Sequence, residues 1–205
     1  FKDTKIGRIP KDWEVKKIGE ILETSSGGTP LRTNSEYYIN GTIPWIKTGE
    51  LNNKYLFESK EHITKSALRN SSAKLFPKHS ILVAMYGATI GKMSIILNEM
   101  ASNQACCALL PTSKAHYEFL YYALIKRKDT LISRGVGGAQ PNISQTLIKV
   151  FELPFPPLPE QQKIAAILSE ADAKIEKEQT QKAQLEALKK GLMQQLLTGK
   201  KRVKV

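Results

Sequence analysis

The string at 87–92 resembles part of a phosphate-binding loop but does not complete its motif. It reads GATIGK, whereas a P-loop has four residues between its glycines and a Ser or Thr after the lysine. Here three residues separate the glycines, and Met93 follows the lysine. The flanking segments 80–86 and 93–97 are short and apolar, which is typical of strands. We therefore expect a hairpin turn at this position rather than a site for nucleotide hydrolysis.

Two other strings have some residues of DNA-modifying enzymes. Asp12, Glu14 and Lys16 have the acid-x-acid-x-lysine spacing of metal-dependent nucleases. That site needs a second acid on a neighbouring strand, and only Asp3 lies upstream, so we interpret these side chains as a solvated face. A DNA amino-methyltransferase needs a polar residue before its Pro-Pro-aromatic string to hold the flipped base, and the nearest string, 154–157, lacks it. We expect no catalytic site in this chain.

The cysteine and histidine positions do not indicate a metal site. Cys106 and Cys107 are adjacent in an apolar run, so on a strand their side chains point to opposite faces. We interpret them as buried free thiols, with a vicinal disulfide or a metal pair as the alternatives. His62, His79 and His116 lack the close spacing of zinc ligands. We expect neither a bound metal nor a cofactor.

Charge and composition favour a polyanion as the binding partner. The 205 residues include 31 Lys and Arg against 19 Asp and Glu, a formal charge of +12, and 41% are hydrophobic. The hydrophobic content supports a folded core, and the charge makes nucleic acid the leading ligand class. The sequence shows no charged-then-apolar leader and no apolar run of about 18 residues. We expect a cytoplasmic location and no membrane association.

The pattern of apolar residues predicts an α+β fold with a strand-rich domain. Short apolar runs separated by Gly, Asn and Pro are typical of strands. The predicted strands are 43–46, 55–57, 81–86, 93–97 and 105–110. Residues 10–24 predict a further strand or turn before a polar break at 24–33. Apolar residues recur at helical spacing near 64–70 and over 116–132.

The end of the sequence predicts one long helix beyond a domain boundary. Segment 153–159 has four prolines in seven residues, so we expect an extended connector there and a recognition domain over 1–152. Residues 160–199 contain no proline and many helix formers, which predicts a single helix. A basic tail, 200–205, follows.

Apolar residues on the predicted helix follow the alternating four-and-three spacing of a coiled-coil seam. They are Ile164, Leu168, Ala171, Ile175, Leu185, Leu192 and Leu196. Glu178 and Lys182 are polar positions near its middle. We expect the seam to pair with the same helix of a second chain, in antiparallel orientation. The alternative is a helix that folds back on its own domain.

Three polar loops are rich in glycine, at 25–32, 85–92 and 133–144. Small residues let the backbone approach phosphates, and polar side chains supply donors to phosphates and base edges. The loops can therefore form a DNA-facing rim. The alternative is that each is an ordinary turn between strands.

The order of seven short strings resembles the specificity subunit of type I restriction-modification systems. They are IPKDWEV at 9–15, SGGTP at 26–30, PWIKTGEL at 44–51, GATIG at 87–91, QPNIS at 140–144, LPFPPLPEQQKI at 153–164 and LLTG at 196–199. The resemblance covers nearly the whole chain.

The resemblance implies a DNA target recognition domain and a helix that spaces two such domains and docks methyltransferase subunits. Methyl transfer and its S-adenosylmethionine would belong to that partner, and a restriction subunit would join the complex in a prokaryotic cytoplasm. Family members usually carry two recognition domains and two helices in one chain. This sequence has one of each, which implies a half-subunit or a fragment.

The resemblance also separates two kinds of candidate DNA-binding residue. The shared loops look alike in members with different targets, so they are expected to position the phosphate backbone or to shape the fold. We expect base selection by neighbouring residues: Arg32, Asn34, Lys47, Asn52, Lys54 and Arg134. The remaining candidates are Thr29, Tyr86, Lys92, Gln140 and Asn142.

Two other functions compete with this interpretation. One is an autonomous DNA-modifying enzyme with an unusual site. The other is a basic coiled-coil adaptor that binds RNA or protein. A salt-dependent comparison of duplex DNA with RNA separates the adaptor from a DNA reader.

Overall fold

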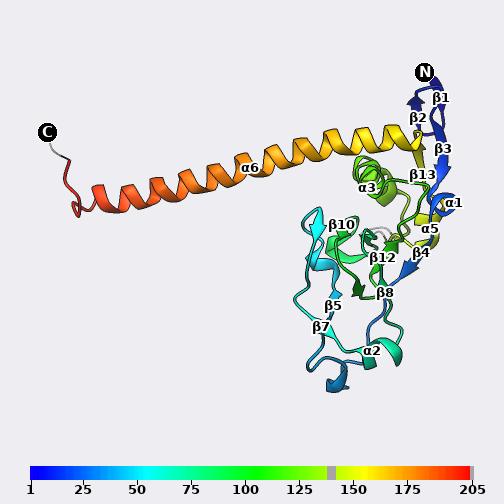
Figure 1. Cartoon of the computed structure of the whole chain (residues 1–205), viewed down its shortest axis with the longest axis horizontal. Coiled ribbons are helices and arrows are strands. Elements are labelled where there is room, and N and C mark those ends of the chain that lie inside the picture. The colour runs from blue at the N-terminus through cyan, green and yellow to red at the C-terminus, as the bar shows by residue number, and fades with distance from the viewer. Residues whose placement is uncertain (138–141, 204–205) are drawn as a thin grey trace. The chain divides into compact units, whose positions relative to one another are not determined.

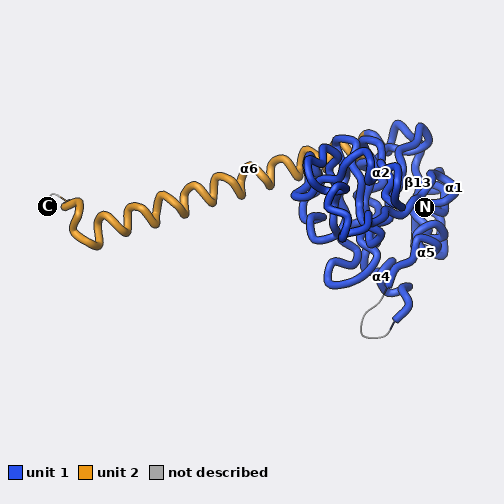
Figure 2. The backbone as a smooth tube through the Cα atoms, turned by 90° about the horizontal axis from the view of Figure 1, so that it is seen from below, with its two compact units in different colours: residues 1–162 blue, residues 163–205 orange. Residues whose placement is uncertain are grey.

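The computed structural model describes residues 1–137 and 142–203. The chain divides into two units, residues 1–162 and 163–205. The first contains every strand among the described residues, and the second contains most of one long helix (Figure 2). The boundary between these two units falls inside the helix.

Two mixed sheets form the centre of the first unit (Figure 1). The larger has the order β4 (Thr24–Ser26), β12 (Cys106–Leu109), β9 (Ile81–Ala84), β10 (Met93–Ile96) and β6 (Tyr55–Leu56). The smaller has the order β7 (His62–Ile63), β5 (Ile43–Ile46), β11 (Met100–Ser102) and β8 (Leu75–Phe76). The β6–β10 and β5–β11 pairs are parallel, and the other pairs in these sheets are antiparallel. All five predicted strand segments are confirmed.

Two strand pairs complete the sheet structure. β1 (Lys2–Thr4) pairs with β2 (Gly7–Ile9), and β3 (Glu14–Lys17) pairs with β13 (Glu152–Phe155), both antiparallel. Part of the predicted proline-rich connector is thus a strand of the first unit. Pro154 faces Val15 in this pair, and the two-stranded sheet tolerates a proline because every strand in it is an edge strand.

Short helices connect and cover the sheets. They are α1 (Ile18–Ile21), α2 (Lys65–Arg69), α3 (Tyr117–Lys126), α4 (Lys128–Ser133) and α5 (Gln145–Val150). The 3-10 turns are η1 (Ser35–Tyr37), η2 (Thr48–Glu50) and η3 (Gly87–Thr89). Thr64 and Ser144 accept hydrogen bonds from Ala67 N and Leu147 N, so their hydroxyls cap α2 and α5. The helix predicted near 64–70 is therefore confirmed.

The single helix predicted over 116–132 is wrong, because the chain breaks into α3 and α4 at Arg127. This residue has φ −109° and ψ 12°, outside regular helix geometry. Its Nη1 donates to the carbonyl of Ile6 at 3.2 Å, and its guanidinium lies 5.5 Å from the Phe151 ring centroid. These tertiary contacts hold the break, which the regular apolar spacing did not reveal.

Two buried clusters stabilise the sheets. One combines residues from both sheets, including Ile46, Phe76, Leu82, Met100 and Cys106. The other lies around Trp45 on the smaller sheet, together with Ile63 of β7 and Ala67 of α2. Burial of such apolar side chains supplies most of the driving force for folding.

The cysteine prediction is also confirmed. Cys106 and Cys107 are adjacent on β12, free and fully buried. Burial raises the pKa of each thiol to about 12. Both thiols are therefore protonated and unreactive at neutral pH.

The GATIGK segment is the predicted hairpin turn. β9 and β10 are antiparallel neighbours, and Gly91 N donates to Ala84 O at 2.9 Å. Gly87 and Gly91 have φ of 77° and 73°, a region that favours glycine. The glycines therefore close the turn between two strands.

The long helix α6 spans Leu158–Leu196. It begins two residues before the predicted start at 160. Pro159 lies in its first turn, where backbone N–H groups have no partner within the helix, so the missing proline N–H costs no hydrogen bond. Gly199, with φ 72°, follows its end, as is common after helix C-termini. Lys174 pairs with Glu170 at 3.0 Å on its surface. Across the described residues, no helix combines the length and apolarity needed to cross a membrane.

Gly28 makes the closest backbone approach in the first loop. A Cβ atom at this position would overlap the Ser72 carbonyl group. The Gly28 carbonyl also accepts a 2.9 Å hydrogen bond from the Trp45 indole. We predict that Gly28→Ala lowers the free energy of unfolding by about 1–3 kcal/mol through overpacking, measured by urea denaturation with tryptophan fluorescence.

Gly49→Ala is the matched control, because a Cβ at Gly49 meets nothing within 4 Å. It should change the unfolding free energy by less than about 0.5 kcal/mol. Equal effects of the two substitutions would contradict the packing role of Gly28.

Candidate nucleic-acid interface

The turn between β11 and β12 brings the three glycine-rich loops to one edge of the first unit. In the first loop, the Thr29 hydroxyl bonds to the side chain of Gln104 in this turn. In the second, Met85 N donates to Ala105 O at 2.9 Å. The third loop is joined to the second, because Ile143 N donates to Met85 O at 2.8 Å. Loops far apart in the sequence therefore form one continuous rim.

Helix α5 connects the rim to the larger sheet. The Gln145 amide nitrogen donates to Thr24 O at 2.8 Å, and its carbonyl oxygen accepts from the Ser26 hydroxyl at 2.9 Å. Gln145 therefore joins the end of the third loop to the strand that leads into the first loop. This residue was not among the sequence candidates.

The third loop closes through a backbone pair. Val136 N donates to Asn142 O at 3.0 Å, and Asn142 N donates to Val136 O at 2.8 Å. Arg134 precedes this pair, and its guanidinium lies 5.4 Å from the Phe151 ring centroid. Gln140 lies outside the described residues.

A largely apolar hollow of about 620 Å³ lies between the second and third loops. Tyr86, Arg134 and Asn142 line it, together with Leu147 and Val150. Tyr86 is exposed. The structure thus brings three of the sequence candidates together around one hollow, with donors and an aromatic ring that suit contact with a base or sugar.

Lys92 and Asn52 form a second pair of candidates. The Lys92 ammonium donates to Asn52 Oδ1 at 2.7 Å, and the Asn52 amide donates to Gly49 O at 2.6 Å. Lys92 lies at the end of the second loop, and Asn52 is exposed. The pair therefore places a cation, hydrogen-bonded to Asn52, at the end of the second loop.

Lys54 lies in a partly buried network instead of on an open surface. Its ammonium donates to the Tyr122 hydroxyl at 2.6 Å and lies 3.3 Å from Glu118, which also accepts from the Tyr55 hydroxyl. Only 13% of the Lys54 side chain is exposed. Burial alone would lower the pKa of Lys54, but hydrogen bonds to the Tyr122 and Tyr55 oxygens outweigh it and raise the pKa above its usual value.

Arg32 and Lys47 share one carboxylate. Arg32 Nη1 donates to Glu61 Oε2 at 2.7 Å, and the Lys47 ammonium pairs with Glu61 Oε1. The pKa of Glu61 lies below its usual value, because hydrogen bonds from Lys47 and then Arg32 stabilise the charged form more than partial burial opposes it. Asn34 has a local role, since its side chain accepts from Glu36 N at 3.1 Å and caps η1.

Residues in the shared strings mainly hold the fold. The Trp13 indole donates to Glu160 at 3.0 Å, which connects the first string to the start of α6. The fully buried Gln161 amide accepts from His116 N at 3.0 Å and donates to Pro156 O at 2.8 Å. The Glu50 carboxylate accepts from Lys60 N at 2.8 Å. These contacts support the expectation that the shared strings shape the fold.

Gln104 and Glu61 contact candidate residues but were missed in the sequence. Glu61 is 29 positions from Arg32 and 14 from Lys47, so no local spacing identifies it. In the part of the chain that the structure describes, no group of three His, Cys, Asp or Glu side chains is arranged to hold a metal ion.

The chain thus combines a mixed-sheet domain, in which three glycine-rich loops meet, with a long helix. Residues 10–187 match the family model of the type I restriction modification DNA specificity domain, and the chain belongs to this family. The resemblance identified from the seven strings is confirmed.

Two curated relatives show how much of a full-length protein the chain represents. It is 36% identical to the type I restriction enzyme MjaIX specificity subunit of Methanocaldococcus jannaschii, covering 92% of this chain and 44% of the relative. It is 29% identical to the EcoR124I/EcoR124II specificity subunit of Escherichia coli, covering 78% of this chain and 41% of the relative. The chain therefore spans less than half of the length of either.

Solved structures share the fold. A chain described under the assembly and conformational transition of the type I R-M system has a TM-score of 0.73 at 20% identity, over 92% of this chain and 45% of that one. The HsdS subunit from Thermoanaerobacter tengcongensis has a TM-score of 0.66 at 18% identity, with the same two coverages. The predicted α+β class with a long C-terminal helix is confirmed.

The Lys54 network generates a stability prediction. Lys54→Met should lower the free energy of unfolding by about 1–3 kcal/mol, because Glu118 and two tyrosine hydroxyls would lose their partly buried cation. Lys65→Met on α2, which is exposed, should stay within about 0.5 kcal/mol of the parent in the same urea titration. If Lys54→Met instead left stability unchanged and weakened DNA binding, Lys54 would be a DNA contact.

Proposed function

We propose that this chain is a DNA-reading half of a type I restriction-modification specificity subunit. It would bind duplex DNA and read one half of a two-part target site. The observation that carries this proposal is the convergence of three glycine-rich loops on one rim, in a member of the specificity-domain family with a formal charge of +12. Each loop carries one basic side chain, Arg32, Lys92 or Arg134, which suits the phosphate contacts that dominate protein–DNA affinity.

The candidate residues divide by their surroundings. Thr29 lies where the first loop meets the 103–105 turn, and Lys92 lies at the end of the second loop beside Asn52. We assign to these three residues contacts with the phosphate backbone. Tyr86, Arg134 and Asn142 surround the apolar hollow and would approach the sugar or base edges. The Arg32 and Lys47 pair is a separate cationic group. Asn34 and Lys54 are assigned to the fold.

Catalysis would belong to partner subunits. The chain would recruit methyltransferase subunits, which bind S-adenosylmethionine, and a restriction subunit, and would have no turnover of its own. The two protonated thiols and a DNA ligand favour the reducing cytoplasm. Purified chain incubated with DNA, magnesium and S-adenosylmethionine tests this assignment, because methylation or cleavage without partners would support the competing enzyme hypothesis.

The proposal predicts weak binding of the isolated chain to duplex DNA, with strong salt dependence. Because counterion release should dominate, the logarithm of the binding constant should fall linearly with the logarithm of salt concentration. Arg134→Ala should weaken binding by roughly 5- to 30-fold, as expected for one lost contact worth about 1–2 kcal/mol. Fluorescence anisotropy with a labelled duplex measures both effects.

Arg69→Ala is the matched control, because Arg69 is an exposed arginine on α2, outside the three loops. It removes the same charge and should change affinity by less than about 2-fold, as for one screened distant charge. Affinity that does not change with salt would contradict DNA binding, and tighter binding to RNA would favour the adaptor hypothesis. Equal losses in the two variants would show that the loop rim is not the contact surface.

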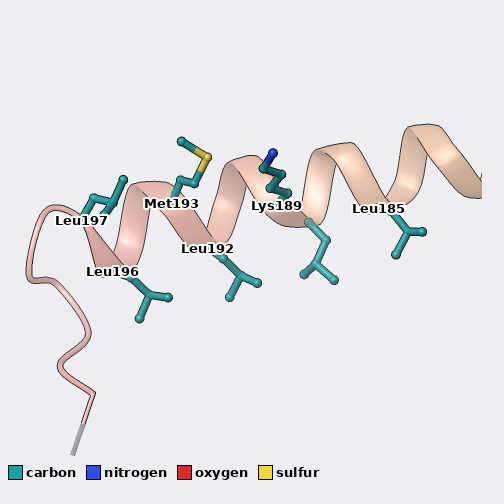
Figure 3. Close-up of a pocket in the computed structure, with 7 residues that line it drawn as sticks. Leu185, Lys189, Leu192, Met193, Leu196 and Leu197 are labelled. Atoms are coloured by element: carbon teal, nitrogen blue, oxygen red, sulfur yellow. The ribbon is translucent and has the colours of Figure 1, made fainter.

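We further infer that two chains pair through α6. The helix exposes apolar side chains along the predicted seam, among them Ile175 at 55%, Leu185 at 58% and Leu192 at 47%. Near the C-terminus the apolar surface widens, with Leu188, Met193 and Leu197 beside Leu192 and Leu196. Figure 3 shows Leu185, Leu192 and Leu196 pointing to the same side of the helix. An apolar stripe of this length favours a partner helix.

Antiparallel pairing would give a twofold-symmetric reader. A helix of 39 residues is roughly 58 Å long at about 1.5 Å per residue, so two recognition domains at opposite ends of the pair could reach separate major grooves. Two identical readers related by a twofold axis imply an interrupted palindrome as the target. Glu178 and Lys182 lie in the middle of the seam, where opposite charges from two chains would fix the register.

The double substitution Leu168→Asp and Ile175→Asp should produce a monomer, because the new carboxylates would be buried against apolar residues in the seam of a dimer. Light scattering should show half the parental mass. Binding to two-part sites should weaken by at least about 100-fold as the second, linked contact is lost, while weak half-site binding remains.

Ala173→Asp with Thr180→Asp is the matched control, since these residues line the polar face of the same helix. It adds the same charge and should leave the dimer intact. A double seam variant with the parental mass would contradict pairing through this stripe.

A further inference from the structure

Arg32 is held between two aromatic rings in an unusual way for an exposed arginine. The centre of its guanidinium lies 4.6 Å from the Tyr38 ring centroid and 4.6 Å from the Trp45 ring centroid. The two rings are themselves perpendicular, with an interplanar angle of 77°. The Tyr38 hydroxyl donates to Pro30 O at 2.6 Å and the Trp45 indole donates to Gly28 O at 2.9 Å. The aromatic support is therefore fixed to the first glycine-rich loop.

Glu61 determines how much of this arginine remains free. Its carboxylate accepts a hydrogen bond from Nη1 of Arg32 at 2.7 Å. Among the described residues, Glu61 is the hydrogen-bond partner of the Arg32 side chain. The Arg32 side chain is 48% exposed. The other guanidinium nitrogens therefore keep N–H donors available to solvent or a ligand, while the rings and the carboxylate hold the guanidinium in place.

The local charge makes a phosphate a poor explanation of this arrangement. Arg32 and Lys47 carry two positive charges, and the Glu61 carboxylate that both contact cancels one of them. A carboxylate next to a phosphate is repulsive, whereas a neutral base edge with two acceptors is not. Directional hydrogen bonding is retained while attraction to anions is reduced.

We propose that Arg32 is a specificity-determining residue that reads guanine through its N7 and O6 atoms, and that Glu61 is the residue that positions it. This inference rests on the proposed DNA-reading function. Guanine is the base whose major-groove edge presents two adjacent acceptors, and a planar arginine fork matches them. The stacked and hydrogen-bonded guanidinium loses little rotamer freedom on binding, so its contact contributes to discrimination efficiently.

Replacing Glu61 should change overall DNA affinity and guanine discrimination in opposite directions. Glu61→Gln preserves the shape of the side chain but removes its negative charge. Binding to random duplex DNA should therefore become tighter, because the local charge rises by one. Discrimination for guanine should fall at the same time, because the arginine loses its charged partner. A residue that only stabilises the fold would not produce this combination.

The experiment selects binding sites from a pool of duplexes with a randomised centre, using the full chain and its Arg32→Ala, Arg32→Lys, Glu61→Gln, Glu58→Gln and Arg69→Ala variants. Glu58→Gln is the matched control for Glu61, since Glu58 is an exposed carboxylate that pairs with His62 instead. Urea titration of each variant checks that the fold is retained. A selected parental site is then tested with 7-deazaguanine at each guanine in turn, which removes the N7 acceptor without any change to the protein.

The proposal expects one G·C pair whose preference drops roughly 5- to 150-fold in Arg32→Ala, as for one bidentate base contact. Arg32→Lys should not restore it, because an ammonium lacks the planar fork. Glu61→Gln should weaken the preference for G·C at the same position. Glu58→Gln should tighten binding to random duplex DNA without weakening that preference. 7-Deazaguanine at that pair should weaken the parent and leave Arg32→Ala unchanged.

The same site preference in the parent and in Arg32→Ala would overturn the proposal. So would a 7-deazaguanine effect that is equal in both proteins, or salt-dependent binding that selects no G·C position at all. In each of these outcomes DNA binding itself survives. Failure to bind any duplex would instead overturn the proposed function, and this inference with it.

Discussion

The turn at 103–105 is the junction on which the candidate interface depends. Here the chain passes from β11 of the smaller sheet to β12 of the larger sheet, so the turn is held by both. Asn103 N donates to Ile46 O at 2.9 Å, and the backbone of the first loop is held beside it by Gly28 N to Ser102 O at 2.9 Å. Because loops attach to this junction by backbone hydrogen bonds, side chains on the rim are free to differ between targets. The arrangement separates the scaffold from the reading residues, as expected where function is carried by loops on a rigid frame.

The same separation appears in the charges. A chain with a formal charge of +12 could bind DNA through indiscriminate cations, but several candidate cations here already have carboxylate or phenol partners. Lys54 is committed to Glu118 and Tyr122, and Arg32 shares Glu61 with Lys47. Such pairing reduces attraction to phosphates and fixes the direction of the remaining donors. In the proposed complex, the cations that stay exposed would supply affinity for DNA, and the paired cations would direct hydrogen bonds.

Local rules predicted the parts of this fold that depend on neighbours in the sequence. The hairpin at 85–92 followed from glycines between two apolar runs, the buried thiols from adjacent cysteines in a strand, and the long helix from its composition. The predictions failed where a distant contact decides the structure. Arg127 interrupts a regular helical pattern because Ile6 and Phe151 hold it, and residues 152–155 form a strand because β3 is available to pair with them. For the same reason Arg32 and Lys47 were predicted from the sequence but Glu61 was not. The role of Glu61 depends on contacts with residues 29 and 14 positions earlier in the chain.

The length of α6 and its proposed pairing would raise the DNA specificity above that of a single recognition domain. A single recognition domain offers a few base contacts, and each contributes only about 1–3 kcal/mol of discrimination. In the proposed dimer, the second domain binds as an intramolecular event, with an effective concentration set by the rigid helix pair. A rigid spacer also penalises half-sites at the wrong separation, because a helix cannot stretch as a flexible linker can. In this dimer the seam would be part of the specificity: the apolar residues at its C-terminal end, Leu192 and Leu196, would affect which DNA is bound without touching it.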